Sequence, residues 1–400
     1  MRFWASAIGI GIVGVLACGR VLDDDAPAAS PSGDASVTDA SPDDDAGDAT
    51  DATSGTAPSA MPCSVAPSCT FAGDGCATTR LYDPIDEGRS EYPHGIATSS
   101  GYVFWASVMA ALDGDDPAAG KGRARVFRVS KTGGADQQPF AIATDQRNVT
   151  ALTATRTHVF WASEVTLASG PRFSVRSAPV ACASPCDATE VYLMASDEIP
   201  TRLIALDETT LWLAKLDGST RLLRLESEEP SPPGWVPEGP GARPMVARTA
   251  LGDFIASPAS VDVMKLDRAA PSTRSFVSVP EGGPPDPGPA ALGGTCDSLW
   301  AVSASGSLFG VGVGSGQPTA PRTLVIPRDT WFDAVGDARF VYLAALGGLK
   351  ALDTTSPAGV VSDIYKGSVR YVAVDDDGVY FGAQGETSLN AGAIYMVAKK

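Results

Sequence analysis

Short runs of β-branched and aromatic residues alternate with turn-forming residues along most of this chain. In the clearest stretch, residues 94–98 and 102–106 are two such runs on either side of a Ser-Ser-Gly turn, and residues 125–129 form a third. Runs of this length, separated by Gly, Ser or Asp, are typical of antiparallel strands. Residues 149–152 and 158–163 repeat the first two runs closely. The pattern therefore predicts a repeated unit of strand, turn, strand, loop and strand.

Seven copies of this unit align on their second strand. Successive copies are 38 to 56 residues apart, and helical periodicity is absent. Repeats of roughly 40 to 45 residues with many β-branched and aromatic positions are typical of four-stranded propeller blades. We predict an all-β fold, a β-propeller with seven blades, or six if the weak fourth copy fails to form. The second strands are residues 103–105, 159–161, 211–213, 253–255, 299–301, 341–343 and 379–381.

A fourth strand is expected after the third strand of each blade. The last copy ends in its third strand, at residues 394–397, while residues 79–82, Thr-Arg-Leu-Tyr, are an unpaired strand candidate before the first copy. We expect residues 79–82 to complete the last blade, because ring closure removes exposed sheet edges. The other candidates for fourth strands are residues 139–142, 190–193, 274–277, 322–325 and 360–365.

The first 17 residues have the pattern of a signal peptide. Arg2 precedes 15 apolar or small residues, fewer than the roughly 20 that a membrane-spanning helix needs. Residues 15–18, Val-Leu-Ala-Cys, resemble the lipobox of bacterial lipoproteins, which implies lipidation of Cys18. Gly19 follows this cysteine, so the resemblance implies delivery to the outer membrane. The alternative is an ordinary signal peptide or uncleaved anchor.

Residues 18–62 are predicted to form a disordered tether. They are rich in Asp, Ala, Ser and Pro and contain almost no large apolar side chains, so they cannot bury enough surface to offset the entropy lost on ordering. The propeller is therefore expected within residues 63–400, held at a membrane by the lipidated Cys18.

The charge distribution argues against a nucleic-acid partner. The net charge is −17, and residues 1–62 contribute −8 of it through two arginines and ten aspartates. The remaining residues show no stripe of Lys and Arg of the kind that phosphate backbones require. We expect a monomer.

The cysteines predict disulfides. Six cysteines remain when Cys18 is set aside, and an even number outside the cytoplasm favours disulfide pairing. Cys182 and Cys186 flank a short Ala-Ser-Pro turn and are expected to pair. Cys63, Cys69, Cys76 and Cys296 can pair in three ways. Zinc is not expected, because C-x-x-C pairs and a His cluster are absent.

The repeats share a pattern: a turn, then Val-Phe-Trp or Val-Tyr, then a short Arg-Val strand. This pattern resembles the repeats of bacterial extracytoplasmic propeller lipoproteins. More loosely, it resembles the repeats of NHL and YWTD (low-density-receptor-type) propellers. The resemblance extends over residues 79–400. Such propellers bind proteins, carbohydrates or peptides, and a minority are hydrolases, lyases or lactonases, so fold analogy implies a range of functions.

No motif for catalysis or cofactor binding is present. The chain lacks G-x-x-x-x-G-K-[ST], H-E-x-x-H and G-x-S-x-G, and it contains two histidines, so we assign no catalytic residue, cofactor or metal.

The residues that begin the innermost strand of each blade should converge on one mouth of the central channel. Two arginines and a histidine among them suggest a small anionic or hydroxyl-rich ligand. The alternative is that these side chains bind neighbouring loops and plug the channel. The aligned positions are His94, Thr150, Arg202, Pro244, Ala290, Asp333 and Arg370.

Two functions follow from these expectations. The first is a membrane-tethered extracytoplasmic binding or scaffold protein with a protein or carbohydrate partner. The second is a propeller hydrolase or lyase with its site at the channel mouth. A strongly shifted acid or base at an open mouth would favour the enzyme.

Overall fold

A computed structural model describes most of the chain after residue 62. Contacts divide the chain into Met1–Gly55 and Thr56–Lys400, and every described residue belongs to the second unit. The predicted signal peptide, Cys18 and the tether lie outside the described residues. Among the residues that the structure describes, no helix is long and apolar enough to cross a membrane. The described residues are 63, 66–67, 76–82, 91–109, 123–132, 138–182, 186–225, 244–267, 272–279, 288–314, 318–319, 321–356, 359–384 and 392–399.

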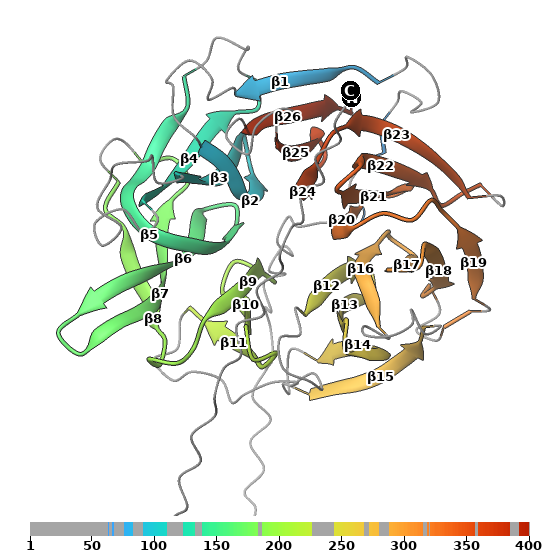
Figure 1. The fold of residues 1–400 in the computed structure, drawn as a ribbon, viewed down its shortest axis with the longest axis horizontal. Coiled ribbons are helices and arrows are strands. Elements are labelled where there is room, and N and C mark those ends of the chain that lie inside the picture. The colour runs from blue at the N-terminus through green and yellow to red at the C-terminus, as the bar shows by residue number, and fades with distance from the viewer. Residues whose placement is uncertain are drawn as a thin grey trace, which may run out of the picture. The chain divides into compact units, whose positions relative to one another are not determined.

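The described residues form strands and connecting turns, as the alternation of apolar and polar residues predicts (Figure 1). The strands are β1 (Thr78–Tyr82), β2 (Glu91–Ser99), β3 (Tyr102–Met109), β4 (Arg123–Ser130), β5 (Phe140–Ala154), β6 (His158–Leu167), β7 (Gly170–Pro179), β8 (Thr189–Leu193), β9 (Pro200–Ala205), β10 (Thr210–Lys215), β11 (Thr220–Arg224), β12 (Met245–Thr249), β13 (Gly252–Ser257), β14 (Ser260–Asp267), β15 (Ser272–Ser278), β16 (Pro289–Gly294), β17 (Ser298–Ser303), β18 (Ser307–Gly312), β19 (Arg322–Val325), β20 (Trp331–Gly336), β21 (Phe340–Ala345), β22 (Gly348–Asp353), β23 (Val360–Lys366), β24 (Val369–Val374), β25 (Gly378–Gln384) and β26 (Gly392–Ala398).

The strands are hydrogen-bonded into a β-propeller, but the number of separate blades differs from the prediction. Five sheets of three or four strands stand as separate blades, and a sixth sheet has seven strands, β2 to β8 in order. Neither seven nor six separate four-stranded blades is therefore correct. The five smaller sheets are β1-β26-β25-β24, β11-β10-β9, β12-β13-β14-β15, β16-β17-β18-β19 and β20-β21-β22-β23.

The long strand β5 is the physical reason for the difference. It pairs with β4 at one edge and with β6 at the other, so the first two repeat units share one sheet. Its register shifts between these pairings, and Asp145 and Asn148 have φ angles of 54° and 45° there. Asp and Asn tolerate this left-handed conformation better than most residues. The chain therefore crosses from one unit to the next without leaving the ladder.

Each of the seven predicted second strands is a strand with an antiparallel partner on both sides. We number the repeat units 1 to 7 by these strands, which are β3, β6, β10, β13, β17, β21 and β25. The weak fourth copy is present as β13, where the buried Asp253 pairs with Arg248 at 3.3 Å. The innermost strands, towards the centre of Figure 1, are β2, β9, β12, β16, β20 and β24. The innermost strand of unit 2 is the second part of β5, whose first part is the outermost strand of unit 1.

The core lies between consecutive units. Among the described residues, one hydrophobic cluster occupies each interface between neighbouring units, including the one between units 7 and 1. Trp161 packs in the first interface and Trp105 in the last, and both are at most 1% exposed. Burial of such large side chains is the main favourable contribution to folding.

The ring is closed by its two ends. Strand β1 pairs antiparallel with β26, with Arg80 opposite Tyr395, which is the pairing predicted for residues 79–82. Leu81 is 1% exposed and lies in the cluster between units 7 and 1.

Disulfides link parts of the described chain. Cys182 and Cys186 are bonded, as their spacing predicts, and Cys63 is bonded to Cys296 across 233 residues. This bond selects among the three pairings left open by the sequence. Cys76 is also in a disulfide. Cys296 lies in the turn between β16 and β17, so the segment before β1 is joined covalently to unit 5.

Ion pairs join unit 7 to both of its neighbours. Lys399, just after β26, lies 3.1 Å from Asp337 of unit 6, and both side chains are 0% exposed. Lys131, just after β4, lies 2.6 Å from Asp375 of unit 7. Each lysine follows a third strand and reaches the first turn of the preceding unit. The same contact therefore occurs at two interfaces of the ring.

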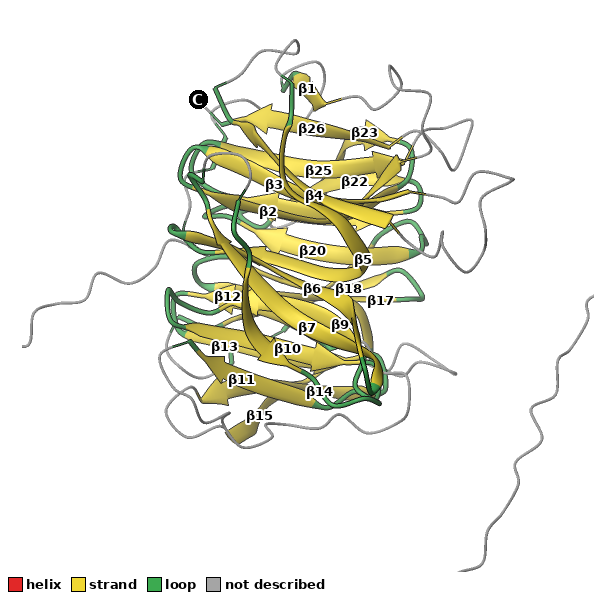
Figure 2. Ribbon diagram, turned by 90° about the vertical axis from the view of Figure 1, so that its left-hand side faces the viewer, coloured by secondary structure: helices red, strands yellow, loops and turns green. Residues whose placement is uncertain are grey.

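The turns gather at two faces of the propeller, seen from the side in Figure 2. We call the face where the innermost strands begin the mouth face. The opposite face carries the turns between first and second strands, including Cys296 and Asp337.

Candidate functional site

A cavity of about 670 Å³ runs along the innermost strands. Residues from all seven innermost strands line it. Its volume lies within the roughly 300 to 1,000 Å³ that small-molecule pockets occupy. The centre of the ring is therefore not filled completely by side chains, and the channel is a candidate binding site.

Six of the seven predicted mouth residues line this cavity. They are His94, Thr150, Arg202, Pro244, Ala290 and Asp333. The seventh, Arg370, does not line it, because its exposed guanidinium lies over the ring of Phe332 at 5.2 Å. Arg370 is thus a neighbour of the mouth and not part of the cavity wall.

An ion pair spans the mouth. Nη2 of Arg202, on β9, lies 2.5 Å from Oδ1 of Asp333, on β20. Units 3 and 6 lie on opposite sides of the ring, so the pair bridges the channel. The side chains are 27% and 12% exposed, and the backbone N–H of Val372 donates to Oδ2 of Asp333 at 3.5 Å. Among the described residues, the expected plug is represented by this ion pair, which lies beside open space.

The bridge divides the mouth into two halves of different chemistry. On the side of units 4 and 5 the mouth is lined by small apolar residues, namely Pro244, Pro258, Gly288, Ala290 and Ala304. Farther along β12, Arg248 also lines the cavity and is paired with Asp253. On the side of units 7, 1 and 2 the mouth is lined by Tyr371, His94 and Thr150. The polar half is therefore the place where a ligand could make directed hydrogen bonds.

His94 is uncharged at neutral pH. Burial, with a smaller contribution from the positive charge of Arg370, lowers its pKa from 6.5 to about 4. Its Nδ1 lies 3.3 Å from the carbonyl oxygen of Val149, which can only accept, so Nδ1 carries the proton. Nε2 of the neutral ring is then an acceptor, and the ring packs edge-on against Tyr371 at 5.5 Å.

Two buried polar atoms in the cavity wall lack partners. Oγ1 of Thr150 and Nε1 of Trp331 make no hydrogen bond to the residues that the structure describes, and both residues line the cavity. Buried polar groups are usually paired, and an orphan costs about 1 to 3 kcal/mol. Less than 1 Å² of each atom is accessible, so a bound molecule or water would reach them only after the side chain turns.

Trp331 and Tyr371 were not among the predicted residues. Trp331 lies two positions before the aligned Asp333, Tyr371 directly follows the aligned Arg370, and both line the same cavity. A search for aromatic residues at neighbouring positions of the repeat would have found both.

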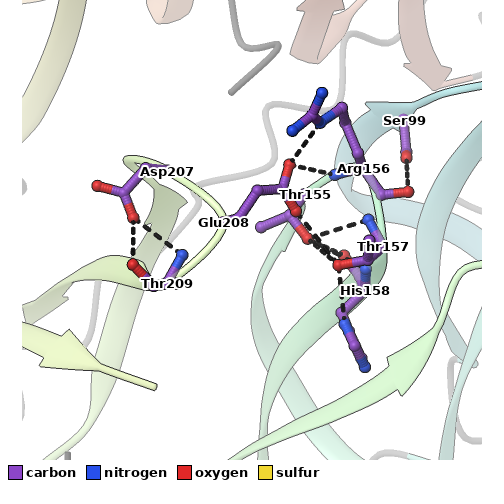
Figure 3. Close-up of polar contacts among 8 residues, drawn as sticks. All are labelled: Ser99, Thr155, Arg156, Thr157, His158, Asp207, Glu208 and Thr209. Carbon is purple, nitrogen blue, oxygen red and sulfur yellow. Dashed lines mark hydrogen bonds and ion pairs between the residues drawn. The ribbon is translucent and has the colours of Figure 1, made fainter. Parts of the chain in front are cut away.

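A second cluster of titratable groups lies on the opposite face, at the turns of units 2 and 3 (Figure 3). Oε1 of Glu208 accepts from the backbone N–H and Nε of Arg156 at 3.0 and 3.1 Å. The Thr157 hydroxyl donates to Oε2 of Glu208 at 3.2 Å. Although burial opposes ionisation of Glu208, these bonds lower its pKa. Glu208 thus links units 2 and 3 by hydrogen bonds, and both of its carboxylate oxygens already accept from residues of unit 2.

Neither site holds a recognisable metal centre. Within the described ranges, no three His, Cys, Asp or Glu side chains are grouped as metal ligands. The polar groups of the mouth are suited to hydrogen bonding with a small molecule.

Comparison with known proteins supports the fold alone. No protein-family model and no curated protein matches this sequence. Among solved structures, the chain is similar to the crystal structure of the WD40 β-propeller domain of Doa1, with a TM-score of 0.53 and 11% sequence identity. The match covers 80% of this chain and 97% of that one. The chain thus has a WD40-like β-propeller fold.

Proposed function

We propose that this chain is a membrane-tethered extracytoplasmic binding protein of the bacterial propeller lipoprotein class, which holds a small ligand at its channel mouth. The observation that carries the proposal is the cavity of about 670 Å³ along the innermost strands, with the polar side chains of His94, Arg202 and Asp333 at its mouth. Lipidation of Cys18 would attach the tether to the outer membrane, and the tether would present the propeller outside the cytoplasm.

The disulfides support this location. Cys63–Cys296 and Cys182–Cys186 are of a kind that persists outside the reducing cytoplasm. Cys63, which directly follows the proposed tether, is bonded to Cys296 in a turn on the face opposite the mouth.

The mouth does hold a strongly shifted base, His94, which by that criterion alone would favour the hydrolase or lyase alternative. The direction of the shift, away from neutral pH, supports binding instead. A general base works best when its pKa is near the working pH. His94, with a pKa of about 4, is a weak base at neutral pH, and the Asp333 carboxylate is held by Arg202.

Ligand titration tests the binding function. The ¹⁵N-labelled mature chain is titrated with glucose, galactose, N-acetylglucosamine and myo-inositol, and with glucuronate and inorganic phosphate. We expect at least one of these molecules to shift amide signals of β2, β5 and β20 selectively. No selective shift with any of these probes would contradict the proposal.

Replacing Cys18 with alanine tests the tether. In a Gram-negative host supplied with radiolabelled palmitate, the unchanged chain should incorporate label and enter the membrane fraction. Cys18→Ala should lose essentially all of the label, because the thiol is the acylation site. The matched control, Cys186→Ser, should keep its label. Equal labelling of Cys18→Ala and the unchanged chain would contradict lipidation at this residue.

A further inference from the structure

We infer that the mouth selects an uncharged, hydroxyl-rich ligand and that Asp333 sets this specificity by occupying the anion-binding position of Arg202. The inference rests on the proposed binding function and names the ligand class of that same site. It follows from the charges that line the cavity and from the hydrogen-bonding groups that remain unused.

The charges at the mouth are paired with each other. Arg202 is the guanidinium that lines the mouth end of the cavity, and its Nη2 is 2.5 Å from Oδ1 of Asp333. Guanidinium groups bind carboxylate and phosphate strongly because they offer parallel N–H donors. A carboxylate from the protein already takes this place. An anionic ligand would have to displace Asp333 and leave it without its cation.

The unused groups match a diol. The neutral His94 offers Nε2 as an acceptor, because its Nδ1 carries the proton. The N–H groups of Arg202 other than Nη2 make no hydrogen bond to any described residue and remain as donors. Neighbouring hydroxyls on a sugar or polyol donate and accept in the same way, while the ring of Tyr371 lines the same half of the mouth and could pack against C–H groups.

Asp333→Asn tests the inference without knowledge of the natural ligand. Asparagine keeps the shape of the side chain but removes its charge, so Arg202 becomes free to bind an anion. Binding of inorganic phosphate and glucuronate is measured by calorimetry on the mature chain, with glucose as the uncharged counterpart of glucuronate. We expect Asp333→Asn to bind phosphate and glucuronate at least about tenfold more tightly than the unchanged chain, a difference of about 1.4 kcal/mol.

Two further variants locate the effect. Adding Arg202→Gln to Asp333→Asn should abolish the gain, whereas adding Arg370→Gln should leave it, because Arg370 does not line the cavity. Similar melting temperatures would verify that the variants are folded. The inference is overturned if the unchanged chain binds phosphate as tightly as Asp333→Asn, or if the gain persists without Arg202.

The outcomes separate this inference from the proposed function. If Asp333→Asn gains phosphate binding through Arg202 but no probe binds the unchanged chain, the specificity role of Asp333 is supported and the binding function fails for the molecules tested. If the unchanged chain binds glucuronate more tightly than glucose, binding at the mouth stands and the selection of an uncharged ligand is wrong.

Discussion

Replacing Lys399 with methionine is expected to lower the free energy of unfolding of the propeller by about 3 to 5 kcal/mol at neutral pH. Lys399 and Asp337 are both 0% exposed, and methionine keeps the apolar stem of lysine while removing its charge. The Asp337 carboxylate then stays buried without its cation. It retains hydrogen bonds from the Tyr342 hydroxyl at 2.6 Å and from the backbone N–H of Phe340 at 2.8 Å, which limits the loss.

Urea unfolding, followed by both tryptophan fluorescence and circular dichroism, measures this change. Coincident curves would support two-state analysis. Lys131→Met is the matched control, because Lys131 makes the equivalent contact to Asp375 and also lies 3.6 Å from Asp377. These carboxylates are 16% and 49% exposed and can be hydrated. The loss for Lys131→Met should be clearly smaller. In the Lys399→Met/Asp337→Asn variant part of the stability should return. A loss below about 1 kcal/mol for Lys399→Met would show that the pair is not a strong link.

Removing the Cys63–Cys296 disulfide by serine substitution at both positions should cost about 3 to 5 kcal/mol. The two cysteines are 233 positions apart in the sequence. A cross-link that closes a longer loop restricts the unfolded chain more. It also holds the segment before β1 on unit 5, while β1 itself pairs with β26 of unit 7.

The matched control is the double serine variant of Cys182 and Cys186, which are separated by only four positions. Its loss should be about 2 kcal/mol or less. Both variants are compared by urea unfolding under oxidising conditions, and the unchanged chain is also measured with reductant. Equal losses for the two disulfides would contradict the role of the long loop.

The repeated strands can be predicted from sequence because their signal is local. An apolar second strand such as residues 159–161, with a turn before it, is recognisable without knowledge of its neighbours. Closure by residues 79–82 also follows, since the last copy lacks a fourth strand. The joining of units 1 and 2 could not be foreseen, because it depends on the backbone angles of Asp145 and Asn148 within β5.

The candidate site is only partly predictable for a similar reason. Alignment of the repeats places His94, Thr150, Arg202 and Asp333 around one channel. It does not show which of these side chains meet across the channel. Arg202 and Asp333 are 131 residues apart, and their pairing depends on the width of the ring. The buried pair of Lys399 and Asp337 was missed altogether. The recurrence of lysine after a third strand, at Lys131 and Lys399, was the signal available in the sequence.

Filling the mouth tests the central claim most directly. Ala290 lines the apolar half of the cavity, and tryptophan there should occupy the space that a ligand needs. Ala338→Trp is the matched control, because Ala338 is exposed in a turn on the opposite face. For the probe bound by the unchanged chain, we expect Ala290→Trp to abolish the amide shifts of the innermost strands and Ala338→Trp to preserve them. Unchanged binding in Ala290→Trp would contradict a ligand site at the mouth.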